Sequence, residues 1–138
     1  MKKQILSAAY IILFDSDKKV LLQHRNNDAE TSPGFWGLFG GYVEEKETPL
    51  SAVKRECYEE LKYKLNRPIL AYEEEMIWRG EKAKNIFYIE RYDNEQKLVL
   101  NYESQGMKWI RINDIKKMKA KPYVINALMK IKSKIKQY

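Results

Sequence analysis

The chain has 138 residues, of which 44% are hydrophobic and 33% charged, and its net charge is +7. This length and composition predict one soluble domain over residues 1–138. The apolar-rich stretch from Ile5 to Phe14 is far shorter than the ~20 residues that a membrane helix needs, so we expect no membrane segment. The lone cysteine, Cys57, excludes an intramolecular disulfide framework and suits a cytoplasmic protein.

Much of the positive charge lies near the C-terminal end, in lysines between Lys116 and Lys136. Such a run is usually the solvated face of a helix, and a basic surface also suits a phosphate-rich small substrate. Nucleic-acid binding through this basic helix is an alternative, although no zinc-finger spacing or RRM-like aromatic motif accompanies it. The net charge alone does not distinguish a small phosphate-rich substrate from nucleic acid as the partner.

The first part of the chain predicts strands. Apolar runs at Ser7–Phe14 and Lys19–His24 are separated by turn residues, so we expect a hairpin. The polar stretch 26–34 ends in Ser-Pro-Gly and predicts a loop. The segment Trp36–Val43 then predicts extended backbone, broken by the pair Gly40-Gly41.

The remaining elements predict an α+β fold. Thr48 as N-cap and Pro49 at the first helical position predict a helix that runs to about Leu61 or Lys62. Further elements are expected as strands Ile69–Trp78 and Asn85–Tyr92 joined near Arg79-Gly80-Glu81, shorter strands Lys97–Leu100 and Met107–Ile112, and an amphipathic helix from about Tyr123 to Lys136. This order predicts a mixed β-sheet with the helices packed on its faces.

The helix that begins at Pro49 carries both an apolar stripe and an acidic cluster. At ~100° per residue, the stripe that should face the sheet consists of Leu50, Val53, Cys57 and Leu61. The acidic cluster on another side consists of Glu56, Glu59 and Glu60. Like charges at this spacing repel by ~0.2–0.5 kcal/mol per pair. The cluster is therefore either a solvated acidic face or a site for a hard cation such as Mg²⁺.

The residues around the cluster favour the cation site. The chain reads Gly41-x5-Glu47-x7-Arg55-Glu56-Cys57-x-Glu59-Glu60, which closely resembles the Nudix box, G-x5-E-x7-R-E-U-x-E-E-x-G-U, with U a bulky apolar residue. The box covers residues 41–63, where Lys62 and Tyr63 depart from its glycine and aliphatic positions. That glycine usually ends the helix in a left-handed conformation, so Lys62 either adopts it with some strain or lets the helix continue.

The resemblance to the Nudix hydrolase family, and to its MutT-like group, implies an α/β/α sandwich. It also implies a Mg²⁺-dependent pyrophosphohydrolase, in which Mn²⁺ can substitute for Mg²⁺. The region around Trp78-Arg79-Gly80 lacks the proline or tyrosine that marks some subfamilies, which leaves a nucleoside triphosphate, including an oxidised dNTP, as the favoured substrate. The alternatives are a nucleotide-sugar or RNA 5′-end pyrophosphohydrolase and a non-catalytic nucleotide-binding Nudix domain. A homodimer, frequent among relatives, is left open.

The same resemblance assigns roles to the box residues. Glu56 and Glu60 would be the principal Mg²⁺ ligands, with Glu59 as a further ligand or as the base near the attacking water. A backbone carbonyl at Gly41 or its neighbour would complete the metal shell. Arg55 would form an ion pair with Glu47 that orients the helix and its ligands.

Outside the box, the resemblance points to four more residues. Glu103 would supply a carboxylate from a later loop as ligand or base, with an ordinary loop carboxylate as an equal alternative, and it competes with Glu59 for the role of base. Arg25, at the end of the second strand, would contact substrate phosphate. Phe35 and Trp36 would stack on a base, with core packing an equal alternative for Trp36.

Overall fold

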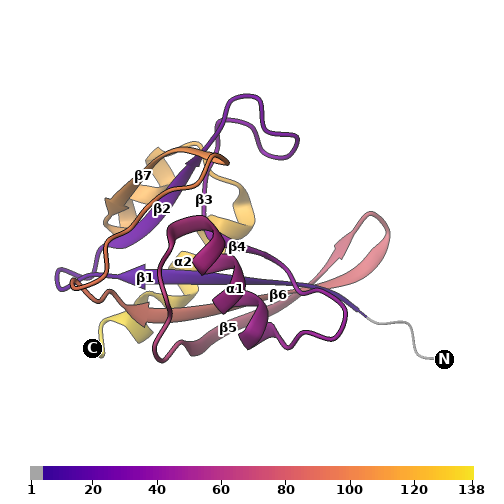
Figure 1. Cartoon of the computed structure of the whole chain (residues 1–138). Coiled ribbons are helices and arrows are strands. Elements are labelled where there is room, and N and C mark those ends of the chain that lie inside the picture. Colours follow the sequence, from indigo (N-terminus) through magenta and orange to yellow (C-terminus); the bar gives the residue numbers. More distant parts are fainter. Residues whose placement is uncertain (1–4) are drawn as a thin grey trace.

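The computed structural model describes residues 5–138, and Figure 1 shows a sheet with α1 in front of it and α2 behind it. The strands are β1 (Leu6–Phe14), β2 (Val20–Arg25), β3 (Trp36–Gly37), β4 (Phe39–Tyr42), β5 (Ile69–Trp78), β6 (Glu81–Arg91) and β7 (Ser104–Ile110). The helices are α1 (Pro49–Leu61), α2 (Pro122–Ile135) and the 3₁₀ helix η1 (Ile112–Lys117).

The seven strands form one sheet in the order β3-β2-β1-β6-β5, with β4 also pairing with β1 and β7 with β2. The β1–β6 pair is parallel, and the other pairs are antiparallel. The sheet is therefore mixed. The expected α+β fold is confirmed.

Alternate residues of the strands pack against opposite helices. In β1, Ile12 and Phe14 belong to the core cluster on the α2 side, whereas Ile11 and Leu13 belong to the cluster on the α1 side. Because successive side chains of a strand point to opposite faces, both faces of β1 are buried. The result is the expected α/β/α arrangement, with one core on each side of the sheet.

Helix α1 begins as predicted. The Thr48 side chain accepts a hydrogen bond from the backbone N–H of Ser51, and the Ser51 hydroxyl accepts one from the backbone N–H of Thr48. The helix ends at Leu61, and Lys62 takes the left-handed conformation with φ 56°. Lys62 thus occupies the glycine position of the box without extending the helix.

The predicted apolar stripe of α1 is wrong at its first residue. Leu50, in the first turn of the helix, is 40% exposed. Val53, Cys57 and Leu61 are fully buried against the sheet, as expected.

Two predicted strands have different bounds. Strand β6 begins at Glu81, not at Asn85, because Arg79 and Gly80 form a two-residue turn with φ 51° and 79°. Strand β7 begins at Ser104 and stops at Ile110, where η1 takes over.

The predicted strand Lys97–Leu100 is wrong. This segment is irregular and lies over the C-terminal end of α1. The N–H of Val99 donates to the carbonyl of Leu61 across 2.9 Å, and the N–H of Asn101 donates to that of Glu60 across 3.1 Å. The segment satisfies the last carbonyls of the helix, which explains why its apolar pattern does not pair with a strand.

Helix α2 covers the other face with its apolar side. Val124, Leu128, Ile131 and Ile135 are all buried, as predicted. Its lysines lie mostly on the exposed side, although Lys134 donates to the carbonyl of Ala71 in β5. In residues 5–138, no helix is both long and apolar enough to cross a membrane.

Candidate functional site

Two glycines let β4 approach both β1 and α1. Gly40 has φ 145°, and a Cβ on it would lie 2.2 Å from the carbonyl oxygen of Ala9. A Cβ on Gly41 would lie 2.7 Å from the Oε1 atom of Glu56. The absence of both side chains therefore places the carboxylates of α1 directly behind the backbone of β4.

Glu60 is the most enclosed of these carboxylates. Its side chain is turned inward and is only 5% exposed. Oε1 accepts a hydrogen bond from the N–H of Gly40 across 3.0 Å, and Oε2 lies 3.5 Å from Nε2 of Gln23. Burial, followed by the hydrogen bond and charge of Glu56, raises the pKa of Glu60 to about 9.

Arg55 links the acidic groups of the loop and the helix. Its Nε and Nη2 atoms bind the two carboxylate oxygens of Glu47 at 2.8 and 2.9 Å. Nη1 donates to Glu56 at 2.9 Å and lies 3.4 Å from both oxygens of Glu59. The hydrogen bond from Arg55 lowers the pKa of Glu47, so this carboxylate is held in its charged form. The sequence-predicted partners Arg55 and Glu47 are thus in direct contact.

The three acidic residues of the predicted cluster do not converge on one point. Glu56 and Glu60 lie together, whereas Glu59 is 55% exposed and faces Arg55. Across residues 5–138, no group of three or more His, Cys, Asp or Glu side chains is gathered closely enough to hold a metal ion. The role of Glu59 as a ligand therefore stays a prediction.

Glu103 reaches the same region from the loop before β7. Asn101 holds this loop against α1, since its side chain donates to the carbonyl of Glu59 at 3.3 Å. The N–H of Glu103 then donates to Oδ1 of Asn101 at 3.0 Å. The charge of Glu103 is one of the causes that raise the pKa of Glu60, so the two carboxylates interact electrostatically.

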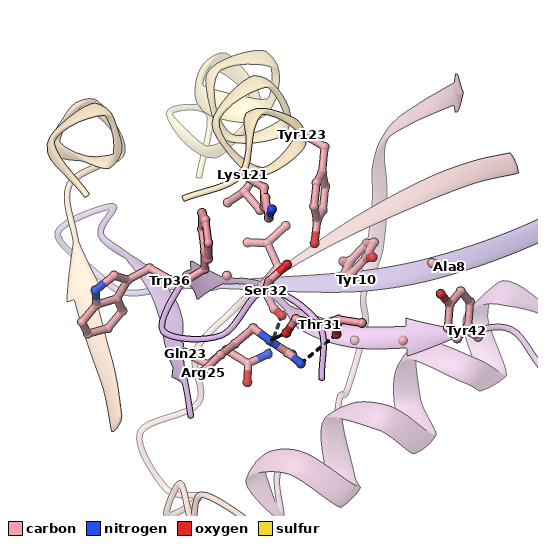
Figure 2. A pocket seen from close by; sticks show the side chains of 16 residues that line it. Ala8, Tyr10, Gln23, Arg25, Thr31, Ser32, Trp36, Tyr42, Lys121 and Tyr123 are labelled. Carbon is pink, nitrogen blue, oxygen red and sulfur yellow. Dashed lines mark hydrogen bonds between the residues drawn. The ribbon is translucent and has the colours of Figure 1, made fainter. Parts of the chain in front are cut away.

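A cavity of about 220 Å³ opens on the other side of Gly40 and Gly41, and we call it the glycine cavity. Its polar lining includes Gln23, Arg25, Thr31 and Lys121. Arg25 is held by Thr31, through Nε to the carbonyl at 3.0 Å and Nη2 to the hydroxyl at 3.1 Å (Figure 2). Two cationic side chains therefore line a cavity that also includes Gly41, the glycine next to the Glu56 carboxylate.

A sequence family model described as NUDIX domain matches residues 5–128. The chain belongs to this family. No match was found among curated proteins. Family membership makes the chain a hydrolase that acts on phosphoric anhydrides.

Solved structures share this Nudix fold along nearly the whole chain. A MutT NUDIX hydrolase from Burkholderia pseudomallei has 23% identity and a TM-score of 0.79, over 94% of this chain and 99% of that one. An Ap4A hydrolase from C. elegans has 18% identity and a TM-score of 0.77, over 97% and 100%. The E. coli dihydroneopterin triphosphate pyrophosphohydrolase has 19% identity and a TM-score of 0.76, over 93% and 95%.

The acidic pair of this Nudix domain has the chemistry of a Mg²⁺ site. Glu56 and Glu60 offer hard oxygen donors, which Mg²⁺ prefers. They are neighbours, Glu60 buried and Glu56 half-buried, and two negative charges at this position repel unless a proton or a cation lies between them. Gly41 has no side chain that would fill the space beside Glu56. The residues present therefore fit the cation that the family implies.

The two aromatic residues predicted to bind a base have different surroundings. Phe35 lines the glycine cavity, and its ring lies 4.6 Å from the Lys119 ammonium and 4.4 Å from that of Lys121. Trp36 stacks on His24 with ring centroids 4.4 Å apart and also packs against the α2-side core. Its indole is turned away from Tyr10 and Tyr123 in Figure 2, which favours a packing role.

Gln23, which was not predicted as a site residue from the sequence, joins several parts of the site. This side chain is 4% exposed; its Nε2 donates to the carbonyl of Leu38 at 2.7 Å, and its Oε1 accepts from the Ser104 hydroxyl at 2.5 Å. The available signal was a polar amide within the apolar run of β2, on the face that packs against α1.

Proposed function

We propose that this Nudix protein is a Mg²⁺-dependent pyrophosphohydrolase whose substrate is a nucleoside triphosphate, ordinary or oxidised. The observation that carries the proposal is the pair of buried Glu60 and half-buried Glu56, packed behind Gly41 beside a cavity with cationic groups. Carboxylates on one side and cations on the other suit a phosphate chain bound together with a divalent ion.

Each box residue then has a defined task. Glu56 and Glu60 would hold Mg²⁺, which when bound neutralises phosphate charge and eases proton loss from water. Arg55 uses both arms of its guanidinium on Glu47, and this bidentate contact fixes its orientation. Through Nη1, Arg55 keeps the Glu56 carboxylate directed toward Gly41.

The cationic residues of the glycine cavity would bind the rest of the phosphate chain. Arg25 has two of its nitrogens bound to Thr31, so its guanidinium is already oriented and loses little freedom on binding. Lys121 stands opposite, next to the N-terminus of α2. Positive charge at both places favours a substrate with more than one phosphate group.

The reaction itself needs a group that accepts a proton from water. As the water oxygen bonds to phosphorus, the bridging P–O bond breaks, and the bridging oxygen leaves with its electron pair on the departing phosphate. A carboxylate of Glu103 or Glu59 would take the water proton. Glu59 faces Arg55, whereas Glu103 lies in the loop that approaches Glu60.

Two comparisons support a nitrogen heterocycle attached to a phosphate chain. The similar structures include an Ap4A hydrolase and a dihydroneopterin triphosphate pyrophosphohydrolase. The aromatic lining of the cavity, with Tyr10, Phe35 and Tyr123, is compatible with such a ring.

The decisive experiment is a panel of nucleoside triphosphates, nucleotide sugars and dinucleoside polyphosphates, assayed with Mg²⁺ for phosphate and pyrophosphate release. We expect the highest kcat/KM with a nucleoside triphosphate. Glu56→Gln should keep the fold and lower kcat by orders of magnitude, because the amide is a weaker ligand of the same shape. The matched control is Glu95→Gln, an exposed carboxylate outside the site, which should behave like wild type.

Three results would contradict the proposal. Wild-type-like turnover in excess EDTA or in Glu56→Gln would remove the metal assignment. A higher kcat/KM with a nucleotide sugar would change the substrate class. Tight nucleotide binding without turnover of any compound would show a non-catalytic binding domain.

A further inference from the structure

A second hollow adjoins the glycine cavity and extends away from the acidic pair. It also has a volume of about 220 Å³, and we call it the aromatic hollow. It shares six lining residues with the glycine cavity: Ala8, Tyr10, Thr31, Ser32, Tyr42 and Tyr123. Because these residues line both, the two hollows join, and Figure 2 shows three of the shared residues, Tyr10, Tyr42 and Ala8, on one side of the glycine cavity.

The register of the sheet gives the distance between the two ends of this space, from Gly40 to Asn85. On β1, Tyr10 pairs with Gly40, and Ala8 pairs with Tyr42 on one side and with Asn85 on the other. Asn85 is thus two residues along the strand and two strands across from Gly40. At ~3.3 Å per residue and ~4.8 Å per strand, the two backbones lie roughly 12 Å apart. A ligand with its phosphates at Gly40 would place a ring attached through a sugar near Asn85.

The lining of the aromatic hollow suits a neutral flat ring better than another phosphate. Its described lining contains no Asp or Glu, and its one charged residue, Lys84, is paired with Glu73 at 3.2 Å. The rings of Tyr42 and Trp78 lie 6.0 Å apart, and the Arg79 guanidinium lies 4.4 Å from the Trp78 ring. Aromatic rings with free faces bind other planar rings by stacking.

One polar group in this lining is poorly satisfied. Asn85 is 7% exposed, and its Nδ2 donates to the sulfur of Met76 at 3.0 Å. A thioether is a weak acceptor. The carboxamide oxygen of Asn85 accepts no hydrogen bond from any side chain or backbone group of residues 5–138. Among residues 5–138 no enclosed side-chain oxygen lacks a hydrogen-bond partner, so the Asn85 oxygen is accessible, and the carboxamide has donor and acceptor capacity for a ligand.

We propose that the aromatic hollow binds the nucleobase of the substrate and that Asn85 reads the hydrogen-bonding edge of that base. The inference rests on the proposed function, because it places the phosphates of the same molecule at Gly40 and Gly41. A carboxamide presents an N–H donor beside a carbonyl acceptor. Its donor can pair with an acceptor on the base edge and its acceptor with the neighbouring donor, as in the asparagine–adenine pair. Asn85 is therefore a specificity-determining residue, and Tyr42 supplies stacking.

The test compares base selectivity in wild type, Asn85→Leu and Tyr42→Leu. Selectivity is the ratio of kcat/KM between the best and the worst of the four ordinary nucleoside triphosphates. Asn85→Leu should reduce this ratio by roughly 5- to 150-fold, the range of one bidentate base contact, because kcat/KM falls most for the base that makes the contact. Tyr42→Leu should weaken all bases together, and Tyr42 is 52% exposed, so the fold should tolerate it.

A binding measurement in EDTA separates this inference from the proposed function. Titration calorimetry with nucleoside monophosphates and with ribose 5-phosphate requires no turnover. We expect at least one nucleoside monophosphate to bind about tenfold more tightly than ribose 5-phosphate, and Asn85→Leu to remove the differences between bases. The matched control is Asn113→Leu, the same change at an exposed site in η1, which should leave both readouts as in wild type.

The kinetic and binding results distinguish a failure of this inference from a failure of the proposed function. Loss of base discrimination in Asn85→Leu, in kinetics or in binding, supports the inference. If this loss is seen in binding but no triphosphate is hydrolysed, only the proposed function fails. Hydrolysis with base ratios unchanged within about twofold in Asn85→Leu and an unchanged KM in Tyr42→Leu overturns the inference alone. Equal binding of ribose 5-phosphate and of every nucleoside monophosphate to wild type also overturns it. If Asn85→Leu does not fold, Asn85→Asp, an acceptor-only isostere, replaces it and should change which base is preferred.

Discussion

The Oε1 atom of Glu60 lies 3.0 Å from the backbone nitrogen of Gly40, so the last turn of α1 is hydrogen-bonded to β4. The same carboxylate lies beside Glu56 on one edge and near the Gln23 amide on the other. One buried side chain thus joins the helix that carries the acidic pair to the strand that lines the glycine cavity. Its protonation should therefore affect stability as well as metal binding.

The first prediction concerns the pH dependence of stability without metal. Burial raises the pKa of Glu60 from the ordinary 4.5 to about 9. Between these values the folded chain binds more protons than the unfolded chain, so the free energy of unfolding falls as pH rises. In EDTA, we expect chemical denaturation to give a value at least about 1 kcal/mol lower near pH 8.5 than near pH 6. Saturating Mg²⁺ should oppose this loss, since it binds the ionised carboxylates.

Glu60→Gln isolates this effect, because glutamine has the same shape and does not titrate. The pH-dependent loss should shrink in this variant and persist in the exposed control Glu95→Gln. An equal pH dependence in wild type and Glu60→Gln would show that other groups cause it.

The second prediction separates the two glycines of β4. In Gly40→Ala the new Cβ would meet the backbone of Ala9 at 2.2 Å, and φ 145° is unfavourable for alanine. We expect a loss of about 2–4 kcal/mol in the free energy of unfolding. In Gly41→Ala the Cβ would meet only the carboxylate end of the long Glu56 side chain and no backbone atom, so stability should change by less than about 1 kcal/mol. Its kcat should fall by ~10²-fold, because the carboxylate is displaced. Equal stability losses in the two variants would contradict this assignment.

The third prediction concerns the catalytic base. Glu103→Gln should lower kcat by ~10²–10⁴-fold with little change in melting temperature, because Glu103 is an exposed loop residue. Glu59→Gln should lose less, since the Glu59 carboxylate already faces Arg55. Steady-state kinetics on the best substrate decides between them. If Glu103→Gln retains most of its activity, Glu103 is not the catalytic base, and Glu59 is assigned that role.

The fourth prediction concerns the backbone of the loop before α1. Lys46, directly before Glu47 of the box, has φ 72° and is exposed. Glycine adopts this conformation at no steric cost, so Lys46→Gly should raise the free energy of unfolding by about 0.5–1 kcal/mol. Glu45→Gly is the matched control, because Glu45 is exposed and has negative φ, and it should destabilise the protein slightly. A lower melting temperature for Lys46→Gly than for wild type would contradict the prediction.

The family and the acidic helix could be predicted from residues 41–63 alone. The box motif has a fixed spacing, and the capping by Thr48, the Pro49 start and the apolar positions Val53, Cys57 and Leu61 are local signals. Local chemistry also predicted the first hairpin, where Asp15 accepts hydrogen bonds from the N–H groups of Asp17 and Lys19. Such features depend on neighbours within a few residues, so a single sequence contains them.

Contacts between distant segments could not be predicted in this way. The segment Lys97–Leu100 has a strand-like pattern, but it satisfies the carbonyls at the end of α1 some forty residues earlier, so tertiary hydrogen bonds override its local preference. Asn85 and Tyr42 come together only because β1 pairs with β4 on one side and with β6 on the other. The sequence by itself therefore determined the family and the acidic helix. Only the tertiary structure decided which buried polar side chains, Gln23, Glu60 and Asn85, face the site, because burial and pairing arise from the folded sheet.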